Sequence, residues 1–274
     1  MDGSEHTLEP SGSGRPRSVT YAGYLRLDEL LSLQRPRAGE HDETLFIVIH
    51  QVYELWFKEL LHELDYACRL LGDGDLPQIL HTMKRVLTIL KVMVAQIDIL
   101  ETMTPREFLT FRDRLDAASG LESFQFREME FLLGHKRDSV LERYPEESDA
   151  RVRLLRRMQA PTLWDAFLRY LSGEGYDVPA EARERDVTAP VEPSEGVQAV
   201  LLEVYRDAPI VWQLCERLVD LDEGLQEWRY RHVKMVERTI GAKQGTGGTP
   251  GVGYLKSTLG RPIFPDLWEI RSRL

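Results

Sequence analysis

The chain has 274 residues, of which 42% are hydrophobic and 29% are charged, and its formal net charge is −10. This composition is typical of a globular protein with a sizeable core, and the acidic balance argues against nucleic acid as the main partner. No apolar run approaches the roughly 20 residues of a membrane-spanning helix, and two cysteines without metal-site spacing favour a reducing cytoplasm.

Residues 1–18 are rich in Gly, Ser and Pro and lack the apolar core of a signal peptide. This composition predicts a disordered N-terminal tail. In residues 19–274, apolar side chains recur every three or four positions, and long strand-like alternation is absent. We therefore expect a single all-α domain over residues 19–274.

Long helices are predicted in three parts of this domain, after a short helix near Tyr24. They cover residues 41–71, 77–103 and 194–240, and glycines follow the first and the last of them. Long helices with short links indicate a helical bundle, which places cofactors between facing helices. The polar residues 135–195 are expected to form a variable excursion with one or two short helices.

The helix that begins at His41 carries Phe46 and His50 four positions apart, and therefore on one face. A ring and an imidazole on a mostly apolar helix indicate either the wall of a pocket or a core histidine with a satisfied hydrogen bond. On this helix alone, the core histidine is the commoner case.

A second histidine, His232, shares a helical face with Trp228 and Met235. A lone histidine on such a face is usually structural. The sequence contains neither HExxH nor CxxC, so neither His50 nor His232 has the spacing of a zinc site. A haem iron needs only one protein ligand, and the two histidines are also compatible with opposite sides of one haem.

Arg112 follows Phe108 by one turn, on a helix that begins at the capping box starting with Thr104. An arginine that points into a bundle needs a carboxylate from the protein or from a ligand. The alternative is a surface arginine paired with Glu107 or Asp116.

The Gly-rich residues 245–251 match neither a Walker A loop nor a dinucleotide fingerprint. This segment carries the hydroxyl side chain of Thr246. It is expected to be either a loop that folds over a ligand or a plain surface turn.

Five segments in this order resemble the tryptophan 2,3-dioxygenase family over about residues 20–135 and 200–270. The segments are YAGYLRLDELL, HDETLFIVIHQVYELWFK, FRDRLDAASG, RYRHVKMVERTIG and GTGGTPGVGYL. The resemblance implies an all-α homotetramer that binds haem b, with ferrous iron for activity. It also implies cleavage of the indole C2–C3 bond of L-tryptophan with dioxygen, which gives N-formylkynurenine.

The resemblance assigns roles to residues of this chain. His232 matches the proximal haem ligand, His50 the distal histidine beside the indole N–H, and Phe46 the ring that packs on the indole. Arg112 matches the partner of the substrate carboxylate, and Phe108 falls among the substrate-binding residues.

Further matches lie in loops and at the N-terminus. Thr246 matches a loop hydroxyl near the substrate carboxylate and ammonium. Ser119 and Gly120 match a turn near the edge of haem and substrate. Tyr21, Tyr24 and Leu25 match an N-terminal segment that reaches the pocket of a neighbouring subunit.

Two departures from the family pattern leave other functions open. Leu121-Glu122 stands where Phe-Gln is common, and Thr249-Pro250 where Ser-Ser is common. One alternative is a relative that mono-oxygenates a substituted tryptophan or indole. Another is a haem sensor without turnover, in which Arg112 and Thr246 would be superfluous.

Overall fold

The computed structural model describes residues 19–116, 118–245 and 251–274. In these residues the regular secondary structure is helical and no strand occurs, which confirms the predicted all-α fold. The chain divides into two compact units, residues 1–35 and 36–274. The predicted role of Thr246 falls outside the described residues.

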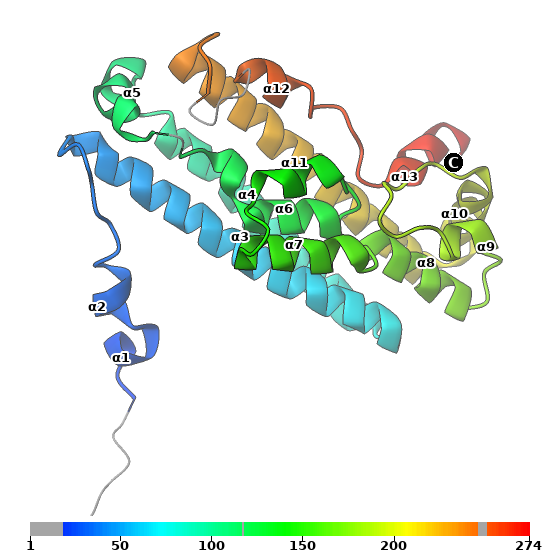
Figure 1. Ribbon diagram of the computed structural model, residues 1–274. Helices are drawn as coiled ribbons and strands as arrows, with labels where there is room; N and C mark the ends of the chain where they lie inside the picture. Colours follow the sequence, from blue (N-terminus) through cyan, green and yellow to red (C-terminus); the bar gives the residue numbers. More distant parts are fainter. Residues whose placement is uncertain (1–18, 117, 246–250) are drawn as a thin grey trace, which may run out of the picture. The chain divides into compact units, whose positions relative to one another are not determined.

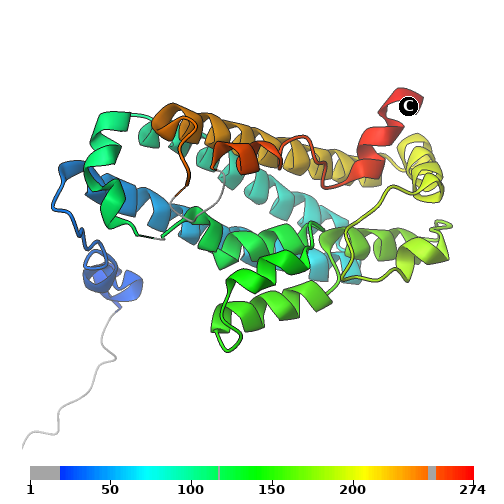
Figure 2. The same ribbon diagram turned by 45° about the horizontal axis from the view of Figure 1, so that its top comes forward.

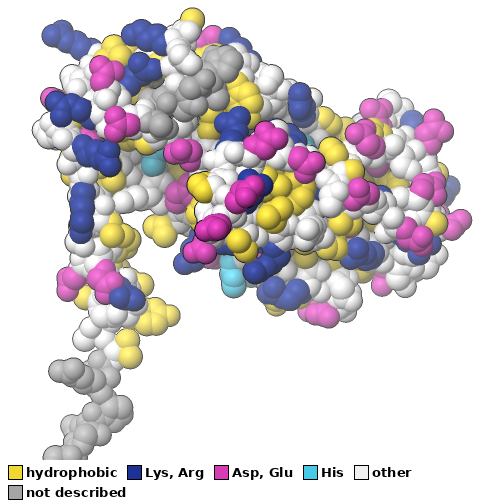
Figure 3. Space-filling view, viewed as in Figure 1, with side chains coloured by type: hydrophobic (Ala, Val, Ile, Leu, Met, Phe, Trp, Pro, Cys, Tyr) yellow, Lys and Arg dark blue, Asp and Glu magenta, His cyan; other side chains and the backbone are white. Residues whose placement is uncertain are grey.

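The N-terminal unit contains two short helices, α1 (Tyr21–Leu25) and α2 (Leu27–Leu30), where the sequence predicts one. They are separate because Arg26 between them has a left-handed backbone with a φ of 50°. Tyr21 and Tyr24 are 77% and 78% exposed, and apolar side chains show on the surface of this unit in Figure 3. The unit buries none of its helical residues.

Three long helices form the centre of the second unit: α3 (His41–Asp73), α4 (Leu76–Leu100) and α11 (Pro209–Ile240). α4 packs against both α3 and α11 (Figure 1). Gly74 ends α3 with a φ of 73°, and the side chain of Asp75 then caps α4. Two residues thus reverse the chain and set α3 and α4 side by side, as the bundle prediction requires.

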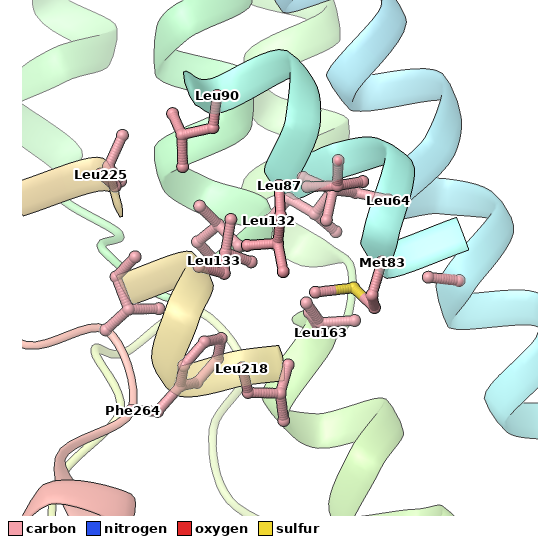
Figure 4. Packing of buried hydrophobic residues seen from close by; sticks show 14 of the residues in the cluster. Leu64, Met83, Leu87, Leu90, Leu132, Leu133, Leu163, Leu218, Leu225 and Phe264 are labelled. Carbon is pink, nitrogen blue, oxygen red and sulfur yellow. The ribbon is translucent and has the colours of Figure 1, made fainter. Parts of the chain in front are cut away.

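The core of this unit consists of aliphatic and aromatic side chains from helices far apart in the sequence (Figure 4). Fully burying one such side chain contributes about 1.5–3 kcal/mol. Members that Figure 4 labels are Leu64, Met83, Leu87, Leu90, Leu132, Leu133, Leu163, Leu218, Leu225 and Phe264.

The predicted capping box at Thr104 is present: its hydroxyl accepts from the Glu107 N–H, and the Glu107 side chain accepts from the Thr104 N–H. It begins α5 (Pro105–Phe111), which ends one residue before Arg112. A short 3-10 helix (Arg112–Arg114) follows. Arg112 therefore lies at the end of its helix.

The apolar pattern after Gly120 predicts one helix up to Leu133. The structure has a 3-10 helix (Gly120–Glu122) followed by α6 (Phe124–Leu132). The break lies at Ser123, whose extended backbone (φ −62°, ψ 98°) interrupts the helix. The hydroxyl of Ser123 accepts from the N–H of Phe126 and thereby caps α6.

Residues 135–195 form more structure than the sequence suggests. They contain a 3-10 helix (Asp138–Arg143), α7 (Asp149–Gln159), α8 (Leu163–Gly173) and α9 (Ala180–Arg183). α7 packs on α6 and α8 on α3 (Figure 2). The expectation of a surface excursion is wrong for α8, whose side chains join the main core: Leu163, Trp164, Phe167, Leu168 and Leu171.

Lys136 connects this region to the rest of the unit. Its side chain is buried, and its ammonium group donates to the carbonyl oxygens of Met158 (2.8 Å), Ala160 (2.5 Å) and Val187 (2.6 Å). Burial lowers its pKa to about 8. Three carbonyls use all three donors of the ammonium group, so this buried charge is fully hydrogen-bonded.

The predicted helical region 194–240 is two helices, α10 (Glu195–Asp207) and α11. The break lies at Ala208, which has a non-helical backbone (φ −125°, ψ 78°). Pro209 follows it, and a proline disfavours the helical conformation of the preceding residue. The proline then occupies the first position of α11, where its missing N–H is tolerated.

The C-terminal residues form α12 (Val252–Lys256), α13 (Pro265–Glu269) and a last 3-10 helix (Ile270–Arg273). Phe264 lies in the core of the same chain and is fully buried. Asp222 of α11, also fully buried, accepts three hydrogen bonds from this segment through one oxygen. The donors are the N–H groups of Ile263 (2.7 Å) and Phe264 (3.1 Å) and the indole of Trp268 (2.9 Å).

Acidic and basic side chains are interspersed on the face shown in Figure 3. Within the part of the chain that the structure describes, no helix is long and apolar enough to cross a lipid bilayer.

Candidate active site

A cavity of about 280 Å³ is lined by residues of α3, α4, α5, α6, α11 and α12 and by the turn at residues 118–123. This volume is close to the lower end of the range for ligand pockets, about 300–1,000 Å³. Seven predicted site residues from four separate stretches of sequence line this one cavity: Phe46, His50, Phe108, Arg112, Ser119, Gly120 and His232.

His50 is held by its own helix. Its Nδ1–H donates to the backbone carbonyl of Phe46 at 2.7 Å. A carbonyl can only accept, so a neutral ring carries its proton on Nδ1 and offers Nε2 as an acceptor. Burial lowers the pKa of His50, although the Phe46 carbonyl and the charge of Glu54 oppose this. The ring is therefore neutral near pH 7 and presents an acceptor nitrogen.

Phe46 belongs to an aromatic group at the same end of the cavity. Its ring centroid lies 4.1 Å from that of His50, 5.8 Å from Phe108 and 5.6 Å from Phe111. Such tilted and edge-on contacts are typical of packed aromatic side chains. The group forms an apolar wall beside the acceptor of His50, which suits a flat aromatic ligand with one N–H.

His232 enters the cavity from α11. Its ring is stacked on that of Trp228 one turn earlier, with centroids 5.5 Å apart and an interplanar angle of 5°. Burial and the nearby His50 lower its pKa to about 4. Part of its surface still faces the cavity, so the ring is desolvated by protein yet accessible to a ligand. A neutral imidazole is the form that binds metals.

Arg112 reaches the base of the Gly-rich loop. Its Nη2 donates to the carbonyl oxygen of Gln244 at 2.5 Å, and its Nε–H is buried without a hydrogen-bond partner among the described residues. The two carboxylates considered in the sequence have other contacts. Glu107 completes the capping box, and Asp116 pairs with Arg37 at 3.5 Å. Arg112 thus retains donor capacity at the cavity wall.

Ser119 and Gly120 form the turn that closes one side of the cavity. The Ser119 hydroxyl accepts from the N–H of Leu121 at 3.3 Å, and Gly120 begins the 3-10 helix. Leu121, one of the two departures noted in the sequence, also lines the cavity. Tyr21, Tyr24 and Leu25 belong to the N-terminal unit.

A charged cluster at the cavity wall is absent from the sequence prediction. Glu130 of α6 is buried and binds Arg127 (2.5 Å) and Arg137 (2.8 Å) through Oε2 and Arg229 of α11 (2.9 Å) through Oε1. Burial opposes its ionisation, but the charges of Arg127, Arg229 and Arg137 outweigh burial and lower its pKa. The signal for this cluster is one Arg and two Glu residues within the mostly apolar stretch FREMEFLLG.

The comparisons with known proteins agree on one family. The family model described as tryptophan 2,3-dioxygenase matches residues 6–175 and 184–274. A tryptophan 2,3-dioxygenase of Herpetosiphon aurantiacus is 57% identical over 260 residues, which cover 94% of this chain and 99% of the relative. One from Anaeromyxobacter dehalogenans is 55% identical over 262 residues, 96% of this chain and 98% of the relative.

A more distant relative extends the comparison. A tryptophan 2,3-dioxygenase of Bacillus thuringiensis is 43% identical over 260 residues, which cover 94% of this chain and 93% of the relative. Because the family model and these relatives match almost the whole length, the chain belongs to the tryptophan 2,3-dioxygenase family.

Proposed function

We propose that this protein is a haem-dependent dioxygenase that cleaves the indole C2–C3 bond of L-tryptophan. Both atoms of one dioxygen molecule enter the product, N-formylkynurenine, so no further oxidant or reductant is consumed. The observation that carries the proposal is the match to relatives named tryptophan 2,3-dioxygenase, at up to 57% identity among those compared, over nearly the whole chain.

The residues of the cavity fit a haem. His232 supplies the single neutral imidazole that a haem iron needs. The Nε–H groups of Arg127 and Arg229 are buried without a partner among the described residues, and both side chains line the cavity. Unpaired buried donors of this kind suit the carboxylates of the haem propionates. When bound, ferrous haem supplies the oxygen chemistry that amino-acid side chains lack.

His50 orients the substrate in this proposal. Its free Nε2 accepts the indole N–H, and Phe46 packs on the indole ring. Because the ring of His50 is neutral, it accepts this hydrogen bond and does not compete with it as a donor. Fixing the indole at both its N–H and its face holds the C2–C3 bond in one orientation, which favours reaction.

The charged end of the amino acid needs partners in an apolar site. Arg112 binds the substrate carboxylate, since it lies at the cavity wall with an unpaired Nε–H. Thr246 contributes a hydroxyl near the carboxylate and the ammonium group. Phe108, Ser119 and Gly120 complete the wall around the substrate.

The N-terminal unit supports an oligomeric assembly. Tyr21 and Tyr24 are more than three-quarters exposed, and Leu25 is 41% exposed. Large apolar side chains gathered in one small unit are typical of a binding surface. These residues reach the pocket of a neighbouring subunit within a homotetramer. Size-exclusion chromatography of the chain without residues 1–35 tests this, since the tetramer is expected to weaken.

The decisive experiment reconstitutes the purified protein with haem and reduces the iron under anaerobic conditions. Addition of L-tryptophan and oxygen is expected to produce the absorbance of N-formylkynurenine. With labelled dioxygen, the mass of the product should rise by two labelled atoms. One labelled atom without ring cleavage would identify a mono-oxygenase instead. A protein without a Soret band after reconstitution would overturn the haem assignment.

A further inference from the structure

The cluster around Glu130 holds more positive charge than its carboxylate neutralises. Arg127, Arg137 and Arg229 bring three positive charges to one negative charge, which leaves a surplus of two. Side chains of Arg127, Glu130 and Arg229 are 6% exposed or less, so water screens their charges weakly. Arg137 is 29% exposed and lies on the outer side of the cluster, away from the cavity lining.

The cluster is connected to His232 through α11, which carries both Arg229 and His232. Arg229 precedes His232 by three residues on α11, which is less than one helical turn. The ion pair between Arg229 and Glu130 therefore fastens the turn of α11 that carries His232 to α6. Arg229 is held a second time, because its Nη1 donates to the carbonyl oxygen of Thr258 at 3.2 Å.

An aromatic ring lies between the cluster and the histidine. The guanidinium carbons of Arg127 and Arg229 lie 5.2 Å and 6.0 Å from the ring centre of Phe126. That ring is 5.2 Å from Trp228, on which His232 is stacked. Apolar side chains between charges and a metal ligand keep the local dielectric low, so the field of the charges is strong at the ligand.

We propose that Glu130 is a positioning residue that sets the reduction potential of the haem iron bound to His232. It holds Arg127 and Arg229 at the cavity wall, and its carboxylate offsets one of the three positive charges that it binds. This inference rests on the proposed function, since it requires a haem on His232. Reduction removes one positive charge from the iron, so a more positive surrounding favours the ferrous form.

The test measures the midpoint potential of the haem-reconstituted full-length protein by spectroelectrochemistry. Glu130→Gln removes the negative charge and is expected to shift the potential to more positive values. Arg137→Gln removes one positive charge and is expected to shift it to more negative values. The double variant restores the surplus of two charges and should return the potential close to that of the unchanged protein.

A purely structural role for Glu130 predicts another pattern. Loosened packing admits water, so both single variants would shift in the same direction, and the double variant would shift further. That result, or potentials that do not move while haem stays bound, would overturn the proposal. If Glu130→Gln does not fold, the partly exposed Arg137 keeps the proposal open to refutation. An Arg137→Gln protein that binds haem without a shift to more negative potential would overturn it.

Failure of the inference about Glu130 can be distinguished from failure of the proposed function. A protein that binds no haem fails the proposed function before any potential is measured. A protein that binds haem and forms N-formylkynurenine, yet shows no opposite shifts, fails only the inference about Glu130.

Discussion

His50 and Phe46 are joined by two contacts within one helical turn. The Nδ1–H of His50 donates to the Phe46 carbonyl at 2.7 Å, and the two rings lie 4.1 Å apart. The first contact fixes the position of the proton on the imidazole, and the second fixes its plane. A helix thus presents an acceptor nitrogen next to an aromatic face, without help from any other element.

Replacement of the two cavity histidines is expected to have different effects. His232→Ala removes the proposed iron ligand and should abolish stable haem binding. His50→Ala should retain haem but lose about 1–3 kcal/mol of transition-state stabilisation, because the indole N–H is left unpaired. This corresponds to roughly 5- to 150-fold in kcat/KM. Haem spectra and initial rates check both, and a normal haem spectrum for His232→Ala would reject the ligand assignment.

A substrate analogue tests the acceptor role of His50 directly. N1-methyltryptophan has no indole N–H, so the unchanged enzyme should discriminate strongly against it. In His50→Ala this discrimination is expected to shrink, because neither substrate then finds an acceptor. If the ratio of kcat/KM for the two substrates stays the same, His50 does not bind the indole N–H.

Arg112→Ala is expected to weaken substrate binding by about 2–5 kcal/mol, the usual cost of removing one partner of a desolvated charge pair. Arg114→Ala is the matched control, since Arg114 lies two residues away, is exposed and does not line the cavity. Spectral titration with L-tryptophan measures the substrate affinity of both haem-reconstituted variants. An unchanged affinity for Arg112→Ala would contradict its role at the carboxylate.

The stability of the haem-free protein should depend on pH through His232. Its pKa falls from 6.5 to about 4 on folding, so between these values the unfolded chain binds more protons than the folded protein. The free energy of unfolding therefore decreases as the pH is lowered from 6.5 towards 4, by at most about 1.4 kcal/mol per pH unit. His50 acts in the same direction, because its pKa is also lowered.

Chemical denaturation at several pH values from 5 to 6.5 measures this slope. His232→Gln has no titratable group at this position. Its free energy of unfolding should therefore depend less steeply on pH than that of the unchanged protein. Equal slopes for the two proteins would mean that His232 is not desolvated in the folded state.

Asp222→Ala should be strongly destabilising. It leaves three donors of the C-terminal segment without their acceptor, and each unpaired buried donor costs about 1–3 kcal/mol. Asp220→Ala on the same helix is the control, because Asp220 forms a half-exposed ion pair with Arg217 and such pairs contribute about 0–1 kcal/mol. Thermal unfolding of both variants compares the two, and similar losses would refute the anchoring role of Asp222.

Alanine substitutions at two glycines with nearly the same φ, Gly241 and Gly251, should distinguish the cost of backbone strain from the cost of steric crowding. Gly241 (φ 59°) has no atom within 4 Å of an added Cβ, whereas at Gly251 (φ 60°) the added Cβ would lie 2.7 Å from the carbonyl oxygen of Lys243. Gly241→Ala should cost about 1–3 kcal/mol, because a φ of 59° with a ψ of −133° is a backbone conformation that L-residues rarely adopt. Gly251→Ala should cost more, and a smaller loss in thermal unfolding would contradict the crowding.

The sequence predicts the fold well where hydrophobic periodicity is long and uninterrupted. α3 and α4 follow their apolar pattern to within a few residues. The breaks at Ala208 and Ser123 arise from local backbone effects that periodicity does not register. Burial of α8 was missed because its neighbours in sequence are polar, and only tertiary packing reveals which face is covered.

The site is predictable in part, for physical reasons. Phe46 and His50 are neighbours on one helix, so their spacing places them together. Arg112 bonds to a backbone carbonyl 132 residues away, and a carbonyl has no sequence signature. Glu130 was missed because charges in a helix usually indicate a solvated face, while here three arginines make burial of the carboxylate favourable. The roles of the individual site residues remain predictions that the variants above test.

The burial of Lys136 has a consequence for the order in which the molecule folds. Burial removes the hydration of its ammonium group. The three carbonyl acceptors that replace this hydration lie 22, 24 and 51 residues further along the chain. With one or two of them in place, the charge is desolvated without full compensation. Partly docked forms of residues 137–187 are therefore unfavourable, and this region should attach in a single step. Native-state hydrogen exchange is then expected to show one common opening for α7 and for the backbone near Val187.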